Sequence, residues 1–397
     1  MTKSDDKRVP VLRFKGFTDE WEQRKLGEIC KVTKLAGFEF TKYVNYSNTG
    51  SILAIRGINV KKGKFNLQDV KYIDNSNFSR LSRSKLQEGD ILFTYVGTIG
   101  NSAIVPKNVN WYLAPNVCLI RPQDKNSSFI SYLIQSDRFQ HEEIPKWITT
   151  SSQPALSMEN IRKFKIILPL NSEQQKISSL VSKIDKLITL QQRKLRQLKL
   201  LKNALLKRMF TAKKSPTLRF RDFSKDWKLH KLQDITDRLD NARVPVTASK
   251  RIAGSTPYYG ANGIQDYVKG YTHDGEFLLV AEDGANNIND YPVICAKGKI
   301  WVNNHAHVLQ AKNKKIDILF LMYALKFLNM KKYLVGGSRS KLNAETMMKL
   351  ALKLPELDEE HNIGVLIKNM DVLITQYKYR IQKINKFKQF LLQNMFI

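Results

Sequence analysis

The feature that most constrains this chain is a long amphipathic stretch at residues 172–210, because the same pattern returns 186 positions later and closes the sequence. Its apolar residues recur at alternating steps of three and four, which is the spacing of a coiled-coil seam. Each seam position has an apolar or amphipathic counterpart in the second copy, which starts at Ile363 (363 − 177 = 186). The seam positions of the first copy are Ile177, Val181, Ile184, Ile188, Leu195, Leu198, Leu201, Leu205 and Met209.

Both copies carry the same helix-start signals. Leu168-Pro169 and Ser172-Glu173 open the first, and Leu354-Pro355 and Asp358-Glu359 open the second. A proline ahead of a small polar or acidic cap is typical of a helix N-terminus. Each copy therefore predicts one helix, roughly 55 Å long at 1.5 Å per residue. Such helices need a partner along their length, so we expect an antiparallel pair that separates two domains. Two ordinary core helices are the alternative.

A second repeat marks the entrance to each half of the chain. Residues 10–29 and 216–235 align at a shift of 206 (216 − 10 = 206). The aromatic residues of this repeat are interpreted as packed anchors rather than as base-stacking groups. Because the shift falls from 206 here to 186 at the helices, the second module is 20 residues shorter. The positions that keep their residue type are Pro10, Leu12, Arg13, Phe14, Phe17, Trp21, Lys25, Leu26 and Ile29.

The two repeats together predict the domain organisation. Short β-like runs and Gly- and Asn-bearing turns surround a helix-like stretch in the first module, so each module is expected to mix helices and strands. The fold class is α+β, with two mixed α/β target modules in a pseudo-twofold arrangement, separated by two long helices packed as an antiparallel coiled coil. The expected boundaries are 1–167 and 213–353 for the modules, and 168–212 and 354–397 for the helices.

The charge balance indicates the class of partner. Lys and Arg number 66 against 36 Asp and Glu, a net charge of +30, which favours a polyanion such as DNA. No apolar run approaches the ~20 residues of a membrane-spanning helix, and the N-terminus lacks a signal peptide, so we expect no membrane and a cytoplasmic protein. The three cysteines are expected to be reduced. His305 and His307 have no Cys or carboxylate nearby in sequence, so no metal site is expected.

Polar loops in the two modules are the candidate base-reading sites. At a shift of 186, residues 152–156 meet residues 338–342, and a glycine-rich turn follows the strand-like run at 90–96. Asn, Gln, Arg, Ser and Tyr on such loops can reach base edges. For Tyr259 a place in the core is equally open. The candidates are Thr98, Ile99, Gly100, Asn101, Ser151, Ser152 and Gln153 in the first module, and Tyr259, Asn262, Asn286, Asn287, Ser338, Arg339, Ser340 and Lys341 in the second.

Catalytic motifs are missing from the sequence. It contains no G-x-S-x-G elbow, no H-E-x-x-H, no G-x-x-x-x-G-K-[ST] phosphate loop and no [ND]-P-P-[FYW] adenine pocket. The acidic pair Glu282-Asp283 is interpreted as a capped turn rather than a catalytic dyad. The chain is therefore expected to be non-catalytic.

The repeated entrance L-R-F-x-x-F…W-x-x-x-K-L, at 12–26 and 218–232, and the two Leu-Pro exits into long helices resemble a specificity subunit of a type I restriction-modification enzyme. The resemblance covers nearly the whole chain. It implies that the modules are target recognition domains and that the helices set their separation. The implied partners are double-stranded DNA, two methyltransferase subunits that methylate an adenine in each half-site, and two restriction/translocase subunits. It also implies that this chain binds no cofactor, with S-adenosylmethionine, ATP and Mg on the partner subunits.

A physical argument supports the resemblance. Two weak readers joined by a rigid spacer bind together far more tightly than either alone, so the expected target is a split, asymmetric site with an unread spacer. A free-standing sequence-specific DNA-binding protein without modification partners is the alternative, and it predicts wholly polar outer faces on the helices. Leu190, Leu200 and Leu206 lie off the seam, which favours docking of another subunit.

Overall fold

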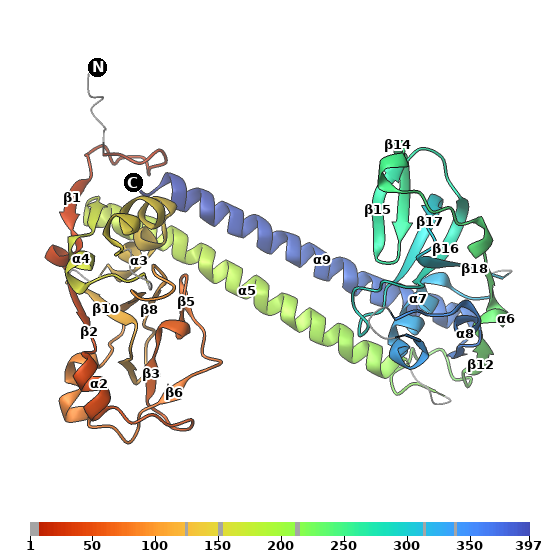
Figure 1. Ribbon diagram of the computed structural model, residues 1–397, viewed down its shortest axis with the longest axis horizontal. Coiled ribbons are helices and arrows are strands. Elements are labelled where there is room, and N and C mark those ends of the chain that lie inside the picture. Colours follow the sequence, from red (N-terminus) through yellow and green to blue (C-terminus); the bar gives the residue numbers. More distant parts are fainter. Residues whose placement is uncertain (1–7, 124–125, 150–153, 211–214, 313–314, 337–339) are drawn as a thin grey trace, which may run out of the picture. The chain divides into compact units, whose positions relative to one another are not determined.

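The computed structural model describes residues 8–397 except 124–125, 150–153, 211–214, 313–314 and 337–339. The chain divides into two compact units. Unit 1 comprises Met1–Gln191 with Arg380–Ile397, and unit 2 comprises Gln192–Tyr379. The two predicted long helices are present as α5 (Asn171–Met209) and α9 (Leu357–Asn394). Each unit therefore contains one module, part of α5 and part of α9 (Figure 1).

Unit 1 is built on a four-stranded antiparallel sheet of order β2-β10-β7-β8. A three-stranded sheet, β6-β3-β9, is mixed because β3 runs parallel to β9, and two ribbons, β1-β11 and β4-β5, complete the module. The strands are β1 (Glu22–Lys25), β2 (Cys30–Lys34), β3 (Leu53–Ile55), β4 (Val60–Lys61), β5 (Lys64–Phe65), β6 (Lys71–Tyr72), β7 (Ile91–Thr94), β8 (Ser102–Ile104), β9 (Trp111–Leu113), β10 (Val117–Pro122) and β11 (Lys165–Leu168). The α-helices are α1 (Leu26–Ile29), α2 (Gly37–Tyr43), α3 (Ser127–Gln135) and α4 (Met158–Lys163).

Unit 2 has a larger, six-stranded mixed sheet of order β13-β18-β16-β17-β14-β15, in which β14 and β17 run parallel. The ribbon β12-β19 matches β1-β11 of unit 1. The strands are β12 (Lys228–Lys231), β13 (Thr236–Arg238), β14 (Ala253–Gly260), β15 (Gly263–Val268), β16 (His273–Ala281), β17 (Val293–Val302), β18 (Ala306–Ala311) and β19 (Ala351–Leu354). The helices are α6 (Leu232–Ile235), α7 (Ile318–Phe327) and α8 (Ala344–Met348). These mixed modules and the paired long helices confirm the predicted α+β class.

Each long helix starts in the core of one unit and ends in the core of the other. The first turns of α5 bury Ile177 and Val181 in unit 1, where Phe396, just past the end of α9, packs at 5.2 Å against Phe129 of α3. In unit 2 the roles are exchanged. Phe210, after the end of α5, stacks at 5.2 Å on Phe320 of α7. Neither core is complete without both helices.

The repeated entrance segments hold both helix ends. The backbone N–H of Leu12 donates to the carbonyl of Asn394 at the end of α9, while Arg13 forms a two-pronged ion pair of 2.7 and 2.8 Å with Glu173 in the first turn of α5. Glu173 is fully buried, and its hydrogen bonds raise the pKa of Arg13. Unit 2 repeats both contacts. The backbone N–H of Leu218 donates to the carbonyl of Arg208 at the end of α5, and Arg219 forms a two-pronged ion pair with Glu359 in the first turn of α9. This explains why the entrance motif is repeated together with the helices.

Contacts between the long helices follow one antiparallel register. Asp185 of α5 pairs with Lys388 of α9 in unit 1, and Lys202 of α5 pairs with Asp371 of α9 in unit 2. From the first pair to the second, α5 advances by 17 residues (185 to 202) and α9 goes back by 17 (388 to 371). The seam residues Ile184, Ile188, Ile363 and Ile367 are buried, as their periodicity predicted. No helix within the described residues is long and apolar enough to span a membrane.

Replacing Phe396 by alanine should destabilise unit 1. Its ring closes the aromatic contact with Phe129 and is 3% exposed, so truncation leaves a cavity that costs about 3 kcal/mol. Phe390→Ala is the matched control, because Phe390 lies six residues earlier, near the end of α9, and is 50% exposed. Thermal unfolding monitored by circular dichroism should show a lower midpoint for Phe396→Ala and an unchanged one for Phe390→Ala. Equal midpoints for both variants would contradict this packing.

The buried carboxyl group of Glu360 should make the stability of unit 2 depend on pH. Burial raises its pKa from 4.5 to about 8, against the effect of the Asp317 N–H that it accepts. Between these values the carboxyl is neutral in the folded chain and ionised in the unfolded chain, so stability falls as the pH rises. The matching position of α5 (360 − 186 = 174) carries the neutral Gln174. Glu360→Gln should therefore raise the unfolding midpoint at pH 9, where the ionised carboxylate costs on the order of 5 kcal/mol of stability, and have little effect at pH 5. An equal shift at both values would rule out the ionisation.

Candidate nucleic-acid interface

In unit 1 the first group of predicted base-reading residues forms a tight turn after β7. The Thr94 hydroxyl donates to the Thr98 carbonyl at 2.5 Å, and the Asn101 N–H donates back to that hydroxyl at 3.0 Å. Gly97 and Gly100 have positive φ, and a Cβ at Gly100 would lie 2.6 Å from Gln140 Oε1. Thr98 is exposed, whereas Ile99 and Asn101 are half-buried and Gly100 is buried. The turn is thus rigid, and Thr98 is its most accessible side chain.

The second predicted group in unit 1, Ser151, Ser152 and Gln153, lies outside the described residues, but both flanks are placed. Ala155 forms antiparallel bridges with Val96 and Thr149, and the Leu156 N–H donates to the Tyr95 carbonyl at 2.9 Å. The flanks of this loop therefore lie beside the turn that carries Thr98.

A pocket of about 450 Å³ opens at the same end of β7. Thr94, Thr98 and Asn101 contribute one wall of it. The rest of the lining comes from α2 and the segment after it, from β4, and from the segments after β3 and β9, and includes Phe40, Tyr46, Lys61, Arg56 and Asn116. Amide, hydroxyl, cationic and aromatic groups converge here, as contact with bases and phosphates requires.

In unit 2, Asn262 and Asn286 come together. Asn262 lies in the turn between β14 and β15, and its Nδ2 donates to the Gly284 carbonyl at 2.9 Å. Its Oδ1 accepts the Asn286 N–H at 2.9 Å. Asn287 follows, and its Oδ1 caps the turn by accepting the N–H groups of residues 289 and 290. All three asparagines are exposed, although part of the hydrogen-bonding capacity of Asn262 and Asn287 is used locally.

Tyr259 belongs to the core. Its side chain is 8% exposed and packs with Phe277, Leu279 and Val308. Of the two interpretations that the sequence left open, the structure supports packing, so the Tyr259 side chain is not available to a base.

The last predicted group has the same setting as its counterpart in unit 1. Ser338 and Arg339 lie outside the described residues, and Ser340 is half-buried. Lys341 bridges Val335 and Asp283, and the Leu342 N–H donates to the Glu282 carbonyl at 2.7 Å. Lys341 and Leu342 are 186 positions after Ala155 and Leu156. Both units therefore pin the corresponding loop to the end of a central strand, β7 in one and β16 in the other.

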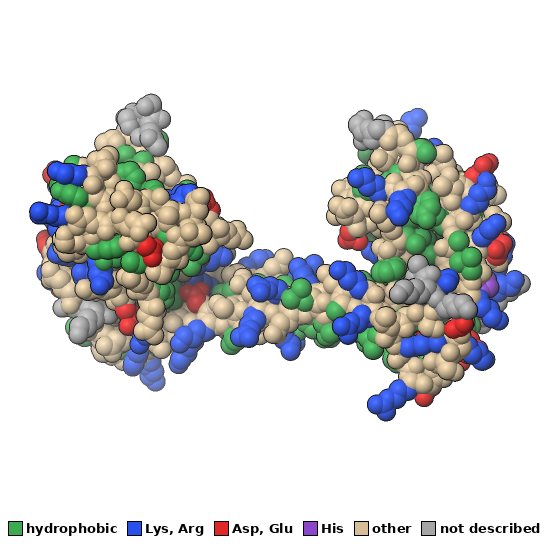
Figure 2. Space-filling model, turned by 90° about the horizontal axis from the view of Figure 1, so that it is seen from below, with side chains coloured by type: hydrophobic (Ala, Val, Ile, Leu, Met, Phe, Trp, Pro, Cys, Tyr) green, Lys and Arg blue, Asp and Glu red, His purple; other side chains and the backbone are tan. Residues whose placement is uncertain are grey.

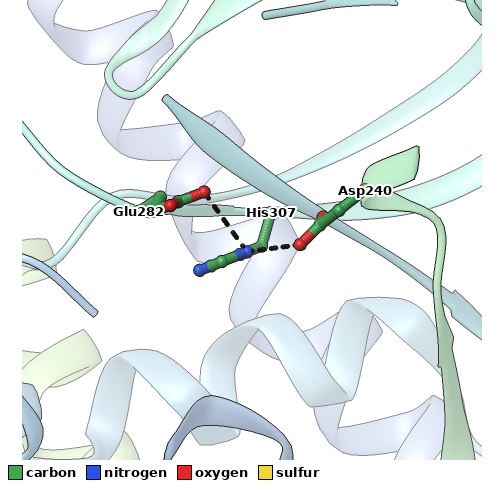
Figure 3. Close-up of side chains that lie close together, drawn as sticks. All are labelled: Asp240, Glu282 and His307. Carbon is green, nitrogen blue, oxygen red and sulfur yellow. Dashed lines mark hydrogen bonds and ion pairs between the residues drawn. The ribbon is translucent and has the colours of Figure 1, made fainter. Parts of the chain in front are cut away.

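An ion-pair network that sequence reasoning missed supports this region of unit 2 (Figure 3). His307 is 1% exposed, and its Nδ1 lies 2.7 Å from Asp240 Oδ2 and 3.6 Å from Glu282 Oε2. Its Nε2 lies 2.9 Å from the Leu342 carbonyl and so must donate a proton. Glu282 pairs with Arg243 at 2.7 Å and with Lys341 at 2.8 Å. The network thus ties β18 to the loop that carries Lys341.

His305 and His307 have no carboxylate close to them in sequence, but the fold brings distant ones to them, Asp283 to His305 and Asp240 to His307. Burial acts to raise the pKa values of Asp240 and Glu282. Hydrogen bonds outweigh it, so the pKa of Asp240 is lowered by the bond from His307, and the pKa of Glu282 by the bonds from Lys341 and Arg243. Asp240, Glu282 and His307 offer ligand atoms within 4.8 Å of one another. Because Arg243 and Lys341 already neutralise Glu282, we interpret the group as structural rather than as a metal centre. The sequence indicated its members only separately, as the acidic pair Glu282-Asp283 and the close pair His305 and His307.

Positive charge extends beyond these loops. In the face shown in Figure 2, Lys and Arg side chains are spread over both units, where acidic groups lie among them, and along the long helices, where few acidic groups are seen. A surface of this kind attracts the phosphate backbone of DNA without regard to its sequence.

Glu282→Gln should weaken unit 2. The change leaves Arg243 and Lys341 without their carboxylate, which costs about 1–3 kcal/mol. Since the pKa of Glu282 is lowered on folding, its contribution is present above its unfolded value and is lost as the pH falls through the folded value. The midpoint deficit should therefore be clear at pH 7 and shrink below about pH 4. Glu276→Gln, at an exposed pair with Lys297, is the control and should have no effect. A deficit that persists at low pH would contradict the ion-pair role.

Comparison with known proteins agrees with the geometry. The chain is 23% identical over 398 residues to a putative type I restriction enzyme specificity subunit of Methanocaldococcus jannaschii, an alignment that covers 94% of this chain and 91% of the relative. A putative specificity subunit of Haemophilus influenzae is 41% identical over 151 residues, which is 38% of each chain.

Solved structures share the fold. The S subunit of a type I restriction-modification system from M. genitalium aligns over 98% of this chain and 99% of its own, with a TM-score of 0.66 and 15% identity. A chain from a study of complex assembly and conformational transition of the type I system aligns with a TM-score of 0.54 and 16% identity, over 95% and 97% of the two chains.

The family pattern described as the type I restriction modification DNA specificity domain matches this chain twice, at residues 18–200 and 224–386. These two matches take in both modules and most of both long helices. The chain therefore belongs to the family of type I restriction-modification DNA specificity subunits, whose role is DNA recognition and not catalysis.

Proposed function

We propose that each unit reads one half of an asymmetric, bipartite DNA site, and that α5 and α9 determine the length of the unread DNA between the halves. In this proposal the recognition domains are residues 1–167 and 213–353, and the spacer helices are residues 168–212 and 354–397.

One observation carries the proposal. Both units pin a loop to the end of a central strand through the same backbone contacts, Leu156 to Tyr95 in one and Leu342 to Glu282 in the other. The side chains around these shared contacts differ: a pocket with Thr98, Asn101 and Asn116 in unit 1, and the Asn262–Asn286 pair with the Glu282 network in unit 2. One scaffold with two sets of polar groups is suited to reading two different sequences.

The helices also present exposed apolar side chains, as a docking site for another subunit requires. Leu190 and Leu200 are each 61% exposed, in agreement with their off-seam positions. Leu206 is different, because it packs against the core of unit 2. Other exposed positions repeat at the 186 shift. They are Leu187 with Leu373, and Leu201 with Phe387. Leu201 and its counterpart Phe387 were predicted as seam positions, but they are 50% and 51% exposed, so the seam prediction is wrong at this pair.

We propose that these faces bind two methyltransferase subunits, which bring S-adenosylmethionine and methylate one adenine in each half-site. Two restriction/translocase subunits, with ATP and Mg, complete the assembly. The competing function is a free-standing sequence-specific DNA-binding protein. The exposed leucines and phenylalanines of α5 and α9 favour the specificity subunit, because exposed apolar side chains on a helix face indicate a surface that binds another protein.

Single-molecule sequencing of DNA methylated by the co-expressed complex, in a host without other methylases, tests both functions. The wild-type complex should methylate adenines in one split, asymmetric motif. Thr98→Ala should relax one half-site and Asn286→Ala the other, by about 1–3 kcal/mol of base discrimination. Asn203→Ala, an exposed amide on α5, is the control and should change neither half. Tight DNA binding by the chain alone, without complex formation, would support the free-standing protein instead.

A further inference from the structure

In each unit, three separate elements meet at one aspartate. In unit 1 the Tyr132 hydroxyl of α3 donates to Asp185 Oδ2 at 2.9 Å. Lys388 of α9 approaches Asp185 Oδ1 at 2.7 Å, and its Nζ lies 5.4 Å from the centre of the Tyr132 ring. A module helix, α5 and α9 are thus joined through a single carboxylate.

Unit 2 contains the same cluster. Tyr323 of α7 donates to Asp371 Oδ2 at 2.8 Å, Lys202 lies 2.5 Å from Asp371 Oδ1, and its Nζ is 5.5 Å from the Tyr323 ring centre. The aspartate now belongs to α9 and the lysine to α5, so the two long helices exchange roles. We call these two clusters, Tyr132–Asp185–Lys388 and Tyr323–Asp371–Lys202, the clasps.

The two clasps are related by the helix repeat but not by the module repeat. Asp185 and Asp371 are 186 positions apart, as are Lys202 and Lys388. Tyr132 and Tyr323 are 191 apart, because insertions and deletions in the modules have changed the distance to the helices. The tyrosine nevertheless reaches the same carboxylate in both units, although the loops around the two modules differ in length.

The clasps are built for directional contact. The lysine side chains are only 17% and 20% exposed, and the aspartates 38% and 41%. Burial, followed by the neighbouring aspartate, raises the pKa of both tyrosines, so each hydroxyl keeps its proton and donates. Each lysine in turn combines an ion pair with a cation–π contact. Such a cluster is satisfied in only one arrangement of its three elements.

Seam contacts alone do not have this property. Apolar side chains that recur every three or four residues pack almost equally well after a shift by one repeat, whereas a polar group in such an interface specifies register. A shift of one helical turn moves one helix by about 5.4 Å along the other. One base-pair step is about 3.4 Å, so a shift of that size corresponds to between one and two base pairs of DNA.

We propose that the two clasps are positioning elements that hold each recognition module in one register on the helix pair and so restrict the complex to one spacer length. This inference rests on the proposed bipartite reading. Asp185 and Asp371 are its central residues, and neither is proposed to touch DNA.

The test uses the complex with its methyltransferase subunits and sequencing of the methylated DNA, on a library in which the unread spacer varies by up to two base pairs. Asp185→Ala combined with Asp371→Ala should keep both half-site sequences and increase methylation at altered spacers on the order of tenfold relative to the wild-type spacer. Tyr132→Phe combined with Tyr323→Phe removes only the hydroxyls and should produce a smaller change in the same direction. If the aspartate variant does not form the complex, the double tyrosine variant tests whether the clasps restrict the spacer length.

A charge exchange separates positioning from general weakening. Asp185→Lys alone should broaden the accepted spacers, and adding Lys388→Asp should restore the narrow preference by re-forming the ion pair with its charges exchanged. Glu159→Lys, at the exposed Glu159–Lys163 pair of α4, changes the net charge by the same amount as Asp185→Lys, and as the control it should leave the spacer unchanged.

The outcomes distinguish the two proposals. A wild-type complex without a split motif would overturn the bipartite reading itself. A wild-type split motif with one spacer, retained unchanged by the aspartate and tyrosine variants, would overturn the role of the clasps while leaving the bipartite reading intact. Broadened half-sites with an unchanged spacer would also overturn it, because the clasps would then affect reading and not position.

Discussion

The structure depends on the burial of both ends of both long helices in the cores of the two units. Phe396 and Phe210 complete the aromatic clusters, while the fully buried Glu173 and Glu359 form ion pairs with the entrance arginines, which are 13% exposed. Removing one member of such a pair leaves an uncompensated charge in the core. The helices are therefore part of the core of each unit and not linkers between independently folded domains.

The same dependence makes a recognition protein possible. The helix ends that close the two cores repeat the same contacts, whereas the loops of the two modules differ in side chains and length. Unit 1 presents an open pocket beside Thr98 and Asn101, whereas unit 2 fills the corresponding region with Glu282, Arg243 and His307. Two modules with unlike surfaces thus share one mode of attachment, which suits the asymmetric DNA site that we propose.

The periodicity of apolar residues was sufficient to predict elements that are continuous in the sequence, such as the long helices. The seam from Ile177 to Met209, the helix-start signals and the entrance repeat predicted both long helices, their pairing and the mixed modules. Prediction was weakest for single side chains. Tyr259 lies in a polar loop sequence but is buried by β16 and β18, and His307 obtains Asp240 from 67 positions away. Local sequence does not contain such contacts, because strand pairing brings them together.

The sequence by itself determined the duplication, the helices, the positive charge and the absence of catalytic motifs, because each of these is a property of residue types and their spacing. Only the tertiary structure decided which loops lie together, which carboxylates are held by cations, and where Tyr132 and Tyr323 meet the long helices. These contacts join residues from 39 positions apart (Arg243 and Glu282) to 203 positions apart (Asp185 and Lys388), and their geometry depends on the strand register and helix packing of the whole unit. Periodicity predicts elements, whereas the positions of functional side chains depend on how those elements pack.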